Sequence, residues 1–246
     1  MTLPVAILVG GLATRMRPLT ETIPKALIEI AGRPFIDYQL KLLRSNGIKK
    51  VVLCLGFLGE KIQEYIKTSE LHGLHIQYSF DGRHPLGTGG AIKKALPLLG
   101  ENFFVLYGDS YLPIDYKSVE TAFIHSKKPA LMTVFRNEGQ LDASNVLYVA
   151  DSSIHPSGCV VLYEKNSPQA YEMHYIDYGL SCCDAAEIAK ENADCFDIAD
   201  VFTRLSKEGN LAGFEVTERF YEVGSFSGIE DFCSYIRRHQ YKHPFL

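Results

Sequence analysis

The chain lacks several features that would assign it to common classes of protein. It has no excess of positive charge: 25 Lys and Arg residues stand against 29 Asp and Glu, for a formal net charge of −4. No global field therefore attracts nucleic acid or an anionic membrane, and any anion site must be local. No apolar run has the length of a membrane span, and the N-terminus lacks the pattern of a signal peptide, so we expect a cytoplasmic protein.

Metal-binding and disulfide patterns are also missing. The six cysteines show no Cys-x-x-Cys spacing, and Cys182 and Cys183 are adjacent, which is poor geometry for an ordinary disulfide. We expect six reduced thiols. His72 and His75 have no third ligand and no His-Glu-x-x-His context, so they predict no zinc site. The chain has no internal repeat and no low-complexity segment.

What the chain does contain is an alternation of strand-like and helix-like segments. Short apolar runs predict strands over 3–9, 51–56, 75–80 and 103–107, and helical patterns lie between them over 34–47, 58–66 and 88–98. This order predicts an α/β fold whose mostly parallel or mixed sheet has helices on both faces. The later part is less regular, with strands expected over 131–135, 146–149, 158–163 and 175–182 and helices over 200–207 and 228–238.

The first predicted strand leads into a segment suited to binding phosphate. It ends at Gly10-Gly11, where the backbone can approach a ligand closely, and Arg15, Arg17 and Lys25 follow within fifteen residues. Exposed amides, an Arg fork and a Lys charge all favour phosphate. Ligands of parallel sheets bind beyond the carboxyl ends of the strands, and Gly10, Gly56 and Asp109 all follow predicted strands.

Three ordered blocks carry a resemblance to a known family. They are Gly10 to Thr20 with Pro24-Lys25-Ala26-Leu27, then Pro85 to Ala91, then Tyr107-Gly108-Asp109. Together they resemble the signature of the sugar-1-phosphate nucleotidyltransferases, in a short single-domain form. The resemblance implies a three-layer Rossmann-like fold of the nucleotide-diphospho-sugar transferase type. It also implies one domain over 1–246, with a nucleotide-binding half over about 1–112 and a sugar-phosphate-binding half over about 113–246.

The implied reaction is attack by a sugar-phosphate oxygen on the α-phosphorus of a nucleoside triphosphate, with release of pyrophosphate. By resemblance, the catalytic residues are Arg15, Lys25 and Asp109. The implied nucleotide-binding residues are Leu8, Gly10, Gly11, Thr14, Arg15, Gly56, Leu86, Gly87, Thr88 and Gly89.

The resemblance also implies Mg²⁺ as cofactor, held by Asp109 and by Glu222, which stands where the family usually has Asp. Carboxylate oxygens suit this hard cation. The sugar phosphate is expected to contact Tyr107, Glu164, Lys165, Asp177 and Gly179. Asp177 replaces a usual Asn, which removes a donor amide and adds charge, and this suggests an altered sugar or a cationic acceptor.

Several alternatives stay open. The Pro85 to Ala91 loop is most similar to loops of relatives that use GTP with heptose or mannose phosphates, although uridylyl and cytidylyl enzymes have similar loops. A cytidylyltransferase acting on phosphocholine is one alternative, and a non-catalytic nucleotide-sugar-binding regulator is another. A dinucleotide-dependent oxidoreductase fits poorly because the opening lacks Gly-x-Gly-x-x-Gly. The expected partners are small molecules, without nucleic acid or membrane, and homo-oligomerisation stays open.

Overall fold

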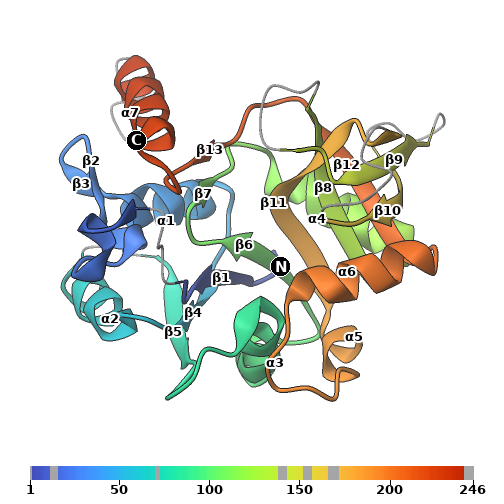
Figure 1. The fold of residues 1–246 in the computed structure, drawn as a ribbon, viewed down its shortest axis with the longest axis horizontal. Helices are drawn as coiled ribbons and strands as arrows, with labels where there is room; N and C mark the ends of the chain where they lie inside the picture. The colour runs from blue at the N-terminus through green and yellow to red at the C-terminus, as the bar shows by residue number, and fades with distance from the viewer. Residues whose placement is uncertain are drawn as a thin grey trace.

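A nine-stranded mixed sheet forms the centre of the molecule (Figure 1). The computed structural model describes residues 2–11, 16–69, 73–137, 143–151, 157–165 and 172–240. The strand order is β5-β4-β1-β6-β11-β8-β12-β10-β9. The strands are β1 (Val5–Val9), β4 (Lys50–Leu55), β5 (His75–Phe80), β6 (Asn102–Tyr107), β8 (Ala130–Arg136), β9 (Val146–Ala150), β10 (Ser157–Tyr163), β11 (Tyr175–Asp184) and β12 (Leu211–Val216).

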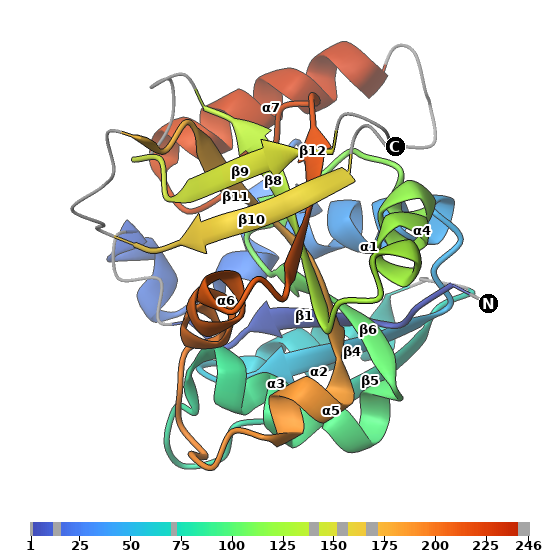
Figure 2. The same ribbon diagram turned by 90° about the vertical axis from the view of Figure 1, so that its right-hand side faces the viewer.

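Helices cover both faces of this sheet, so the predicted three-layer fold is confirmed (Figure 2). One face packs against α1 (Phe35–Ser45), α2 (Gly59–Thr68) and α4 (Tyr116–Ser126), and the other against α3 (Gly87–Leu99), α5 (Ala185–Ala189) and α6 (Ile198–Lys207). Side chains alternate along a strand: in β1, Val5 and Ile7 enter the first core and Ala6 enters the second. Both faces are therefore apolar, which is why the central strands are continuous hydrophobic runs.

A smaller cluster attaches the last helix to the first part of the chain. This helix, α7 (Phe226–Gln240), lies at the upper left of Figure 1. The Phe232 ring meets the rings of Phe35 and Tyr38 edge-on, with centroids 5.3 and 5.5 Å apart. Around this cluster lie two short antiparallel pairs, β2 (Glu29–Ile30) with β3 (Arg33–Pro34) and β7 (Ser110–Tyr111) with β13 (Tyr221–Glu222), and two 3₁₀ turns, η2 (Leu19–Glu21) and η3 (Lys25–Leu27).

The strand and helix predictions agree with the structure within a few residues, but the predictions missed α4, α5 and β12. The sheet is also less parallel than its first half suggests. Strands β5, β4, β1 and β6 run parallel, whereas β11 is antiparallel to both β6 and β8. The sheet continues from the first half of the chain into the second through the β6–β11 pair.

The parallel strands end side by side at one edge. Their last residues are Phe80, Leu55, Val9 and Tyr107. After β1 the chain builds β4 and β5 on one side and then crosses to β6 on the other, so the loops that follow β1 and β6 diverge. Such a divergence opens a crevice at the strand ends, where ligands of open α/β sheets bind.

Two expectations based on missing features can be compared with the structure. All six cysteines are free thiols, and burial raises the pKa of Cys54 to about 12. Within the described part of the chain, no helix combines the length and the apolar character that crossing a bilayer requires.

Candidate active site

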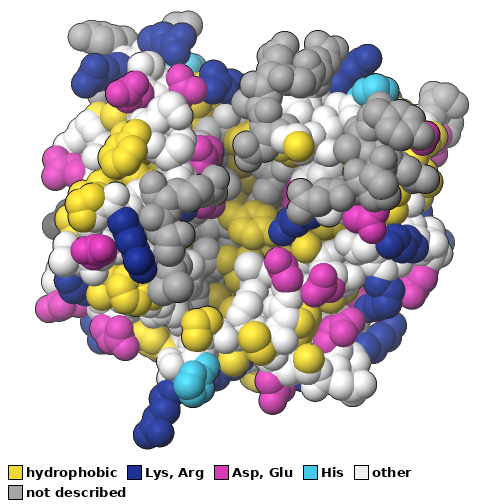
Figure 3. Space-filling model, viewed as in Figure 1, with side chains coloured by type: hydrophobic (Ala, Val, Ile, Leu, Met, Phe, Trp, Pro, Cys, Tyr) yellow, Lys and Arg dark blue, Asp and Glu magenta, His cyan; other side chains and the backbone are white. Residues whose placement is uncertain are grey.

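Two cavities meet at the carboxyl end of β6. The first cavity lies over the ends of β1, β4, β5 and β6, η3 and the start of α3, and the second lies between β6, β10, β11 and the segment from Arg219 to Asp231. Tyr107 and Asp109 line both. Hydrophobic side chains are visible in the hollow at the middle of the face shown in Figure 3. A reaction between two ligands, one in each cavity, would take place beside these two shared residues.

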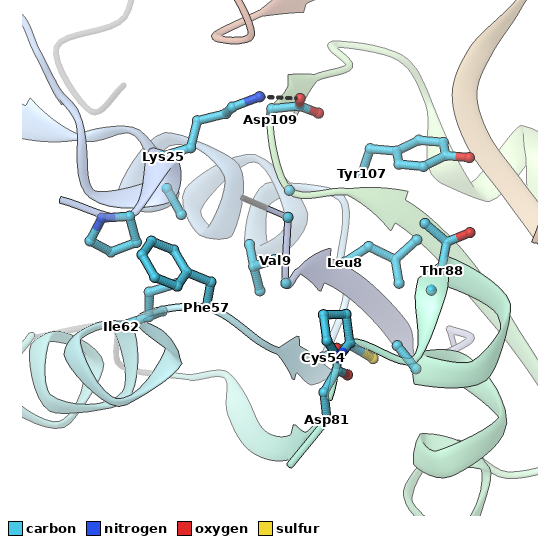
Figure 4. Close-up of a pocket in the computed structure, with 18 residues that line it drawn as sticks. Leu8, Val9, Lys25, Cys54, Phe57, Ile62, Asp81, Thr88, Tyr107 and Asp109 are labelled. Atoms are coloured by element: carbon cyan, nitrogen blue, oxygen red, sulfur yellow. Dashed lines mark hydrogen bonds and ion pairs between the residues drawn. The ribbon is translucent and has the colours of Figure 1, made fainter. Parts of the chain in front are cut away.

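The junction holds an ion pair. Lys25 Nζ donates a hydrogen bond to Asp109 Oδ2 at 2.9 Å, and the two side chains keep 19% and 31% of their exposure (Figure 4). Pro24 has extended backbone (φ −63°, ψ 142°) and directs the chain into η3, where Lys25 is the first residue. The structure thus brings two of the predicted catalytic residues together, from segments far apart in the sequence.

Bare backbone forms part of the first cavity, as predicted for Gly10 and Gly11. Both residues line it, together with Leu8. Among the described residues, a Cβ on Gly11 would meet nothing within 4 Å, whereas a Cβ on Gly10 would lie 3.2 Å from Gly56 N. Gly56 is not among the lining residues, and its own Cβ would lie 2.7 Å from Gly10 O. Gly56 therefore allows β1 and β4 to end close together, and its predicted contact with nucleotide is not seen in the cavity wall.

The loop that begins α3 contributes two of its four predicted nucleotide-binding residues to the wall of the first cavity. Gly87 and Thr88 line the first cavity, but Leu86 and Gly89 do not. A Cβ on Gly89 would collide with the Phe196 ring, and one on Gly87 (φ +71°) would collide with the Phe196 carbonyl. The glycines admit Phe196, whose carbonyl accepts hydrogen bonds from the backbone N–H groups of Gly89 and Gly90. Packing against Phe196 requires a glycine at position 89, and the predicted contact of Gly89 with the nucleotide stays a prediction.

The Thr88 hydroxyl is also occupied within the fold. It donates to Asp197 Oδ1 at 2.7 Å and accepts from the backbone N–H of Ile198 at 2.9 Å, at the start of α6. Asp197 is the N-cap of α6 and also pairs with Lys165 Nζ at 3.5 Å. These contacts link the loop of the first cavity to the predicted sugar-phosphate lysine in the second.

Of the two predicted metal ligands, Glu222 lies on β13 and Asp109 directly precedes β7, the strand that pairs with β13. Glu222 stands opposite Ser110 in the β7–β13 pair, and Val223 N donates to Asp109 O at 2.9 Å. Glu222 accepts from Gly224 N at 2.6 Å and from Ser225 Oγ at 2.9 Å. A Cβ on Gly224 would collide with the Glu222 carboxylate and lie 3.6 Å from Asp109 Oδ2, so both carboxylates border the same small space.

This pair of carboxylates fits a hard divalent cation that shares its coordination shell with substrate. Two oxygen-bearing side chains plus phosphate oxygens and water are a usual environment for Mg²⁺. Among the residues that the structure describes, no group of three or more His, Cys, Asp or Glu could hold a metal by itself. A metal here would therefore depend on the ligands that the substrates bring.

The Asp177 carboxylate lines the second cavity. Asp177 Oδ1 accepts from the backbone N–H of Gly179 at 2.9 Å, and Asp177 N donates to Asn145 Oδ1 at 3.0 Å. Gly179 has φ +101°, a backbone conformation that favours glycine. Burial raises the pKa of Asp177 to about 6, against smaller opposing effects of the Gly179 amide and of Lys165. Tyr107, Lys165, Asp177 and Gly179 all line this cavity, as predicted.

Glu164 does not belong to the wall of either cavity. Glu164 and Lys165 directly follow β10; the Glu164 carboxylate pairs with Lys207 Nζ of α6 at 3.3 Å, whereas Lys165 lines the second cavity. The predicted contact of Glu164 with sugar hydroxyls stays a prediction. The predicted residues Thr14 and Arg15 lie outside the described residues.

Sequence reasoning missed three residues that shape the site. Gln39 of α1 donates through Nε2 to Tyr107 O at 3.0 Å and Ser110 O at 2.6 Å, which holds the turn that carries Asp109. Asn145 supports Asp177, and Asp81 lines the first cavity. Only Asp81 had a usable signal, since it directly follows the predicted strand 75–80 at the edge where ligands bind.

Known proteins resemble this chain in sequence and fold. A family model described as nucleotidyl transferase matches residues 5–151. Mannose-1-phosphate guanyltransferase beta-B of Xenopus laevis is 28% identical over 244 residues, which cover 97% of this chain and 66% of that protein. D-glycero-alpha-D-manno-heptose 1-phosphate guanylyltransferase of Campylobacter jejuni is 40% identical over 114 residues, which cover 46% of this chain and 51% of that protein. The chain thus spans from half to just under two thirds of the length of these curated relatives.

Among solved structures, HddC from Yersinia pseudotuberculosis, complexed with GMP-PN, has the same fold. Its TM-score is 0.75 at 24% identity, and the match covers 96% of this chain and 100% of that one.

Proposed function

Because the chain belongs to the nucleotidyl transferase family, we propose that it transfers a nucleoside monophosphate from a nucleoside triphosphate to a sugar 1-phosphate and releases pyrophosphate. The proposed donor is GTP and the proposed acceptor a mannose or heptose 1-phosphate, the substrates named for the two curated relatives. The observation that carries this proposal is the meeting of the two cavities at Tyr107 and Asp109, with Lys25 beside them.

The arrangement suits the chemistry of two polyanions. An oxygen of the acceptor phosphate forms a new bond to the α-phosphorus, and the bond from that phosphorus to the pyrophosphate oxygen breaks. Catalysis of such a transfer consists mainly of alignment and neutralisation of charge. Lys25 supplies a cation at the junction, and Gly10 and Gly11 leave backbone exposed for the donor. Lys165 offers a second cation on the acceptor side.

Mg²⁺ is part of the proposal. Asp109 and Glu222 would hold it, and it would neutralise phosphate charge when bound. The hydrogen bonds to Glu222 from Gly224 N and Ser225 Oγ fix the carboxylate before any ligand arrives. Ser225 also accepts from Gly228 N and so caps α7. The N-cap of α7 and the proposed metal ligand Glu222 thus belong to one hydrogen-bond network.

A second acceptor class is favoured by one observation. Asp177 puts a carboxylate in the wall of the second cavity, and the rings of Tyr163, Tyr178 and Phe220 line the same cavity. A carboxylate among aromatic rings suits an acceptor with a cationic group, such as phosphocholine. We propose the cytoplasm as the site of the reaction, and oligomerisation stays a prediction that no observation tests.

The experiment is a measurement of pyrophosphate release with Mg²⁺ across the four nucleoside triphosphates and a panel of mannose, heptose and glucose 1-phosphates with phosphocholine. We expect turnover with GTP and a hexose or heptose 1-phosphate. Lys25→Ala should lower turnover by about a hundredfold or more, the scale for loss of a preorganised charge stabiliser. Lys117→Ala, an exposed change on α4, is the matched control. Absence of pyrophosphate release with every pair would refute the proposed function.

A further inference from the structure

The first cavity has two ends, and they differ in charge and in position. Lys25 and Asp109 lie at the end shared with the second cavity, whereas Asp81 lies at the other end, near Cys54 (Figure 4). Under the proposed function the α-phosphorus must lie at the junction, because the acceptor phosphate attacks it there. The nucleobase of the donor is then left at the end where Asp81 stands.

The backbone of Asp81 is held firmly. Asp81 N donates to Leu55 O at 2.8 Å and so extends the β4–β5 ladder by one bond. Its carbonyl accepts from Lys94 Nζ of α3 at 3.1 Å. The side chain therefore projects from a rigid strand end, which is where a residue must stand if it is to discriminate between ligands by geometry.

The carboxylate of Asp81 is aimed at the bare backbone of the strand ends. Its Oδ2 lies 3.4 Å from the position of a Cβ on Gly10 and 3.2 Å from that of a Cβ on Gly56. From the described residues it accepts one long hydrogen bond, from Leu86 N at 3.4 Å. In the described part of the chain, no Lys, Arg or His forms an ion pair with it. An ionised carboxylate has about four acceptor sites, so most of its capacity is left for a ligand.

Guanine is the nucleobase that matches such a group. Its Watson–Crick edge presents two neighbouring donors, N1–H and the N2 amine, which a carboxylate can accept together. Adenine and cytosine each place a ring-nitrogen acceptor beside their amine, and uracil places its N3–H between two carbonyl oxygens. A carboxylate that faces any of these three edges meets at least one acceptor and is repelled by it.

We propose that Asp81 determines nucleotide specificity by accepting both donors of guanine through its carboxylate, which makes GTP the donor substrate. This inference rests on the proposed function and adds the residue that sets the base. Burial raises the pKa of Asp81, and two hydrogen bonds from a base would favour the ionised form again.

The test compares Asp81→Asn with the wild-type protein, using kcat/KM for pyrophosphate release and, separately, nucleotide affinity by calorimetry. Asn still accepts from N1–H but donates where guanine also donates, so it suits the C2 carbonyl of xanthine. We expect GTP affinity and kcat/KM to fall about ten- to a hundredfold in the variant, the scale of a hydrogen bond to a charged group. The preference for xanthosine triphosphate over GTP should rise by at least the same factor.

Two measurements keep the result interpretable. Inosine triphosphate lacks only the N2 amine, so the wild-type protein should prefer GTP to it by about tenfold or more, without any substitution. Asp194→Asn is the matched control, because Asp194 is exposed, pairs with Lys93 at 3.2 Å and lines neither cavity. It should leave the nucleotide profile unchanged.

The outcomes separate this inference from the proposed function. If the wild-type protein uses GTP and inosine triphosphate equally, or if Asp81→Asn keeps the wild-type profile, the role of Asp81 is overturned while nucleotidyl transfer stands. If no acceptor supports pyrophosphate release, calorimetry still decides: GTP binding that Asp81→Asn selectively weakens supports the role of Asp81, and binding that it leaves unchanged, or no binding at all, overturns it.

Discussion

Replacement of Gly89 by Ala tests what the glycine-rich loop is for. The loop closes on Phe196: the Gly89 and Gly90 N–H groups donate to Phe196 O at 2.9 and 3.3 Å, and Phe196 N donates to Leu86 O at 3.0 Å. A methyl group on Gly89 would collide with the ring and lie 2.9 Å from its Cζ. The change should therefore act on folding stability rather than on ligand contact.

The magnitude follows from two opposing effects. Overpacking of this kind costs about 1–3 kcal/mol. Gly89 lies inside α3 without a positive φ, so Ala by itself would stabilise the helix by about 0.5–1 kcal/mol. Phe196 is half-buried, so its ring can move partly toward solvent. We expect a net loss of about 1–2 kcal/mol in the free energy of unfolding.

The effect of Gly89→Ala on stability should change sign in a Phe196→Ala background. In Phe196→Ala the ring is gone, so Gly89→Ala should be neutral or stabilising by up to about 1 kcal/mol, which gives a coupling energy of about 2 kcal/mol between the two positions. Urea denaturation followed by circular dichroism measures all four proteins. Gly11→Ala is the control, because a Cβ there meets no described residue within 4 Å, and the unfolding free energy of this variant should change by less than about 0.5 kcal/mol. An equal effect of Gly89→Ala in both backgrounds would refute the reasoning.

Three further predictions concern the site. Glu222→Gln should raise the Mg²⁺ concentration for half-maximal turnover by about tenfold, because it removes a proposed charged ligand; an unchanged Mg²⁺ titration would contradict it. Asp177→Asn should stabilise the protein at pH 7.5. The folded pKa of about 6 exceeds the ordinary value of 3.8, so the carboxyl contributes stability below pH 4 that is lost as pH rises through 6. The full pKa shift corresponds to about 3 kcal/mol of unfolding free energy, and solvent in the open cavity should reduce the stabilisation of the variant to about 1–2 kcal/mol. Urea titrations should show this stabilisation at pH 7.5 and none at pH 4. Gln39→Leu should lower the free energy of unfolding by about 2 kcal/mol, because Tyr107 O and Ser110 O lose their donor. An unfolding free energy equal to that of the wild-type protein in the same titrations would contradict this and show that water replaces the Gln39 amide.

The positions that the sequence placed at the ligand edge have local signals. The run from Val5 to Val9 is apolar and β-branched, and Gly10 ends it, so strand and ligand edge could be placed together. Parallel strands meet at one edge, which is why Gly10 and Asp109 converge despite their separation. Lys25 followed from the resemblance of the Pro24-Lys25 block, and its ion pair with Asp109 shows where that block folds back.

Other features of the structure depend on partners that no local pattern in the sequence identifies. Glu164 and Lys165 are neighbours just after β10, and only the position of α6 decides that Glu164 pairs with Lys207 while Lys165 lines the second cavity. Gly89 resembles a base-binding glycine in sequence, but the ring of Phe196, which lies far along the chain, fills the space beside it. Strand β12 carries a glycine within six residues, and packing between β8 and β10 outweighs its weak intrinsic propensity.

The sequence by itself determined the α/β class, the edge of the sheet where ligands bind and the family of the chain, because periodicity and short blocks of residues act over a few neighbours. The tertiary structure alone decided that two cavities share Tyr107 and Asp109, that Glu222 borders the same space as Asp109, and that Asp81 stands at the far end of the first cavity. The physical reason is that side chains from separate strands and helices are brought within a few ångströms only when both faces of the sheet are packed.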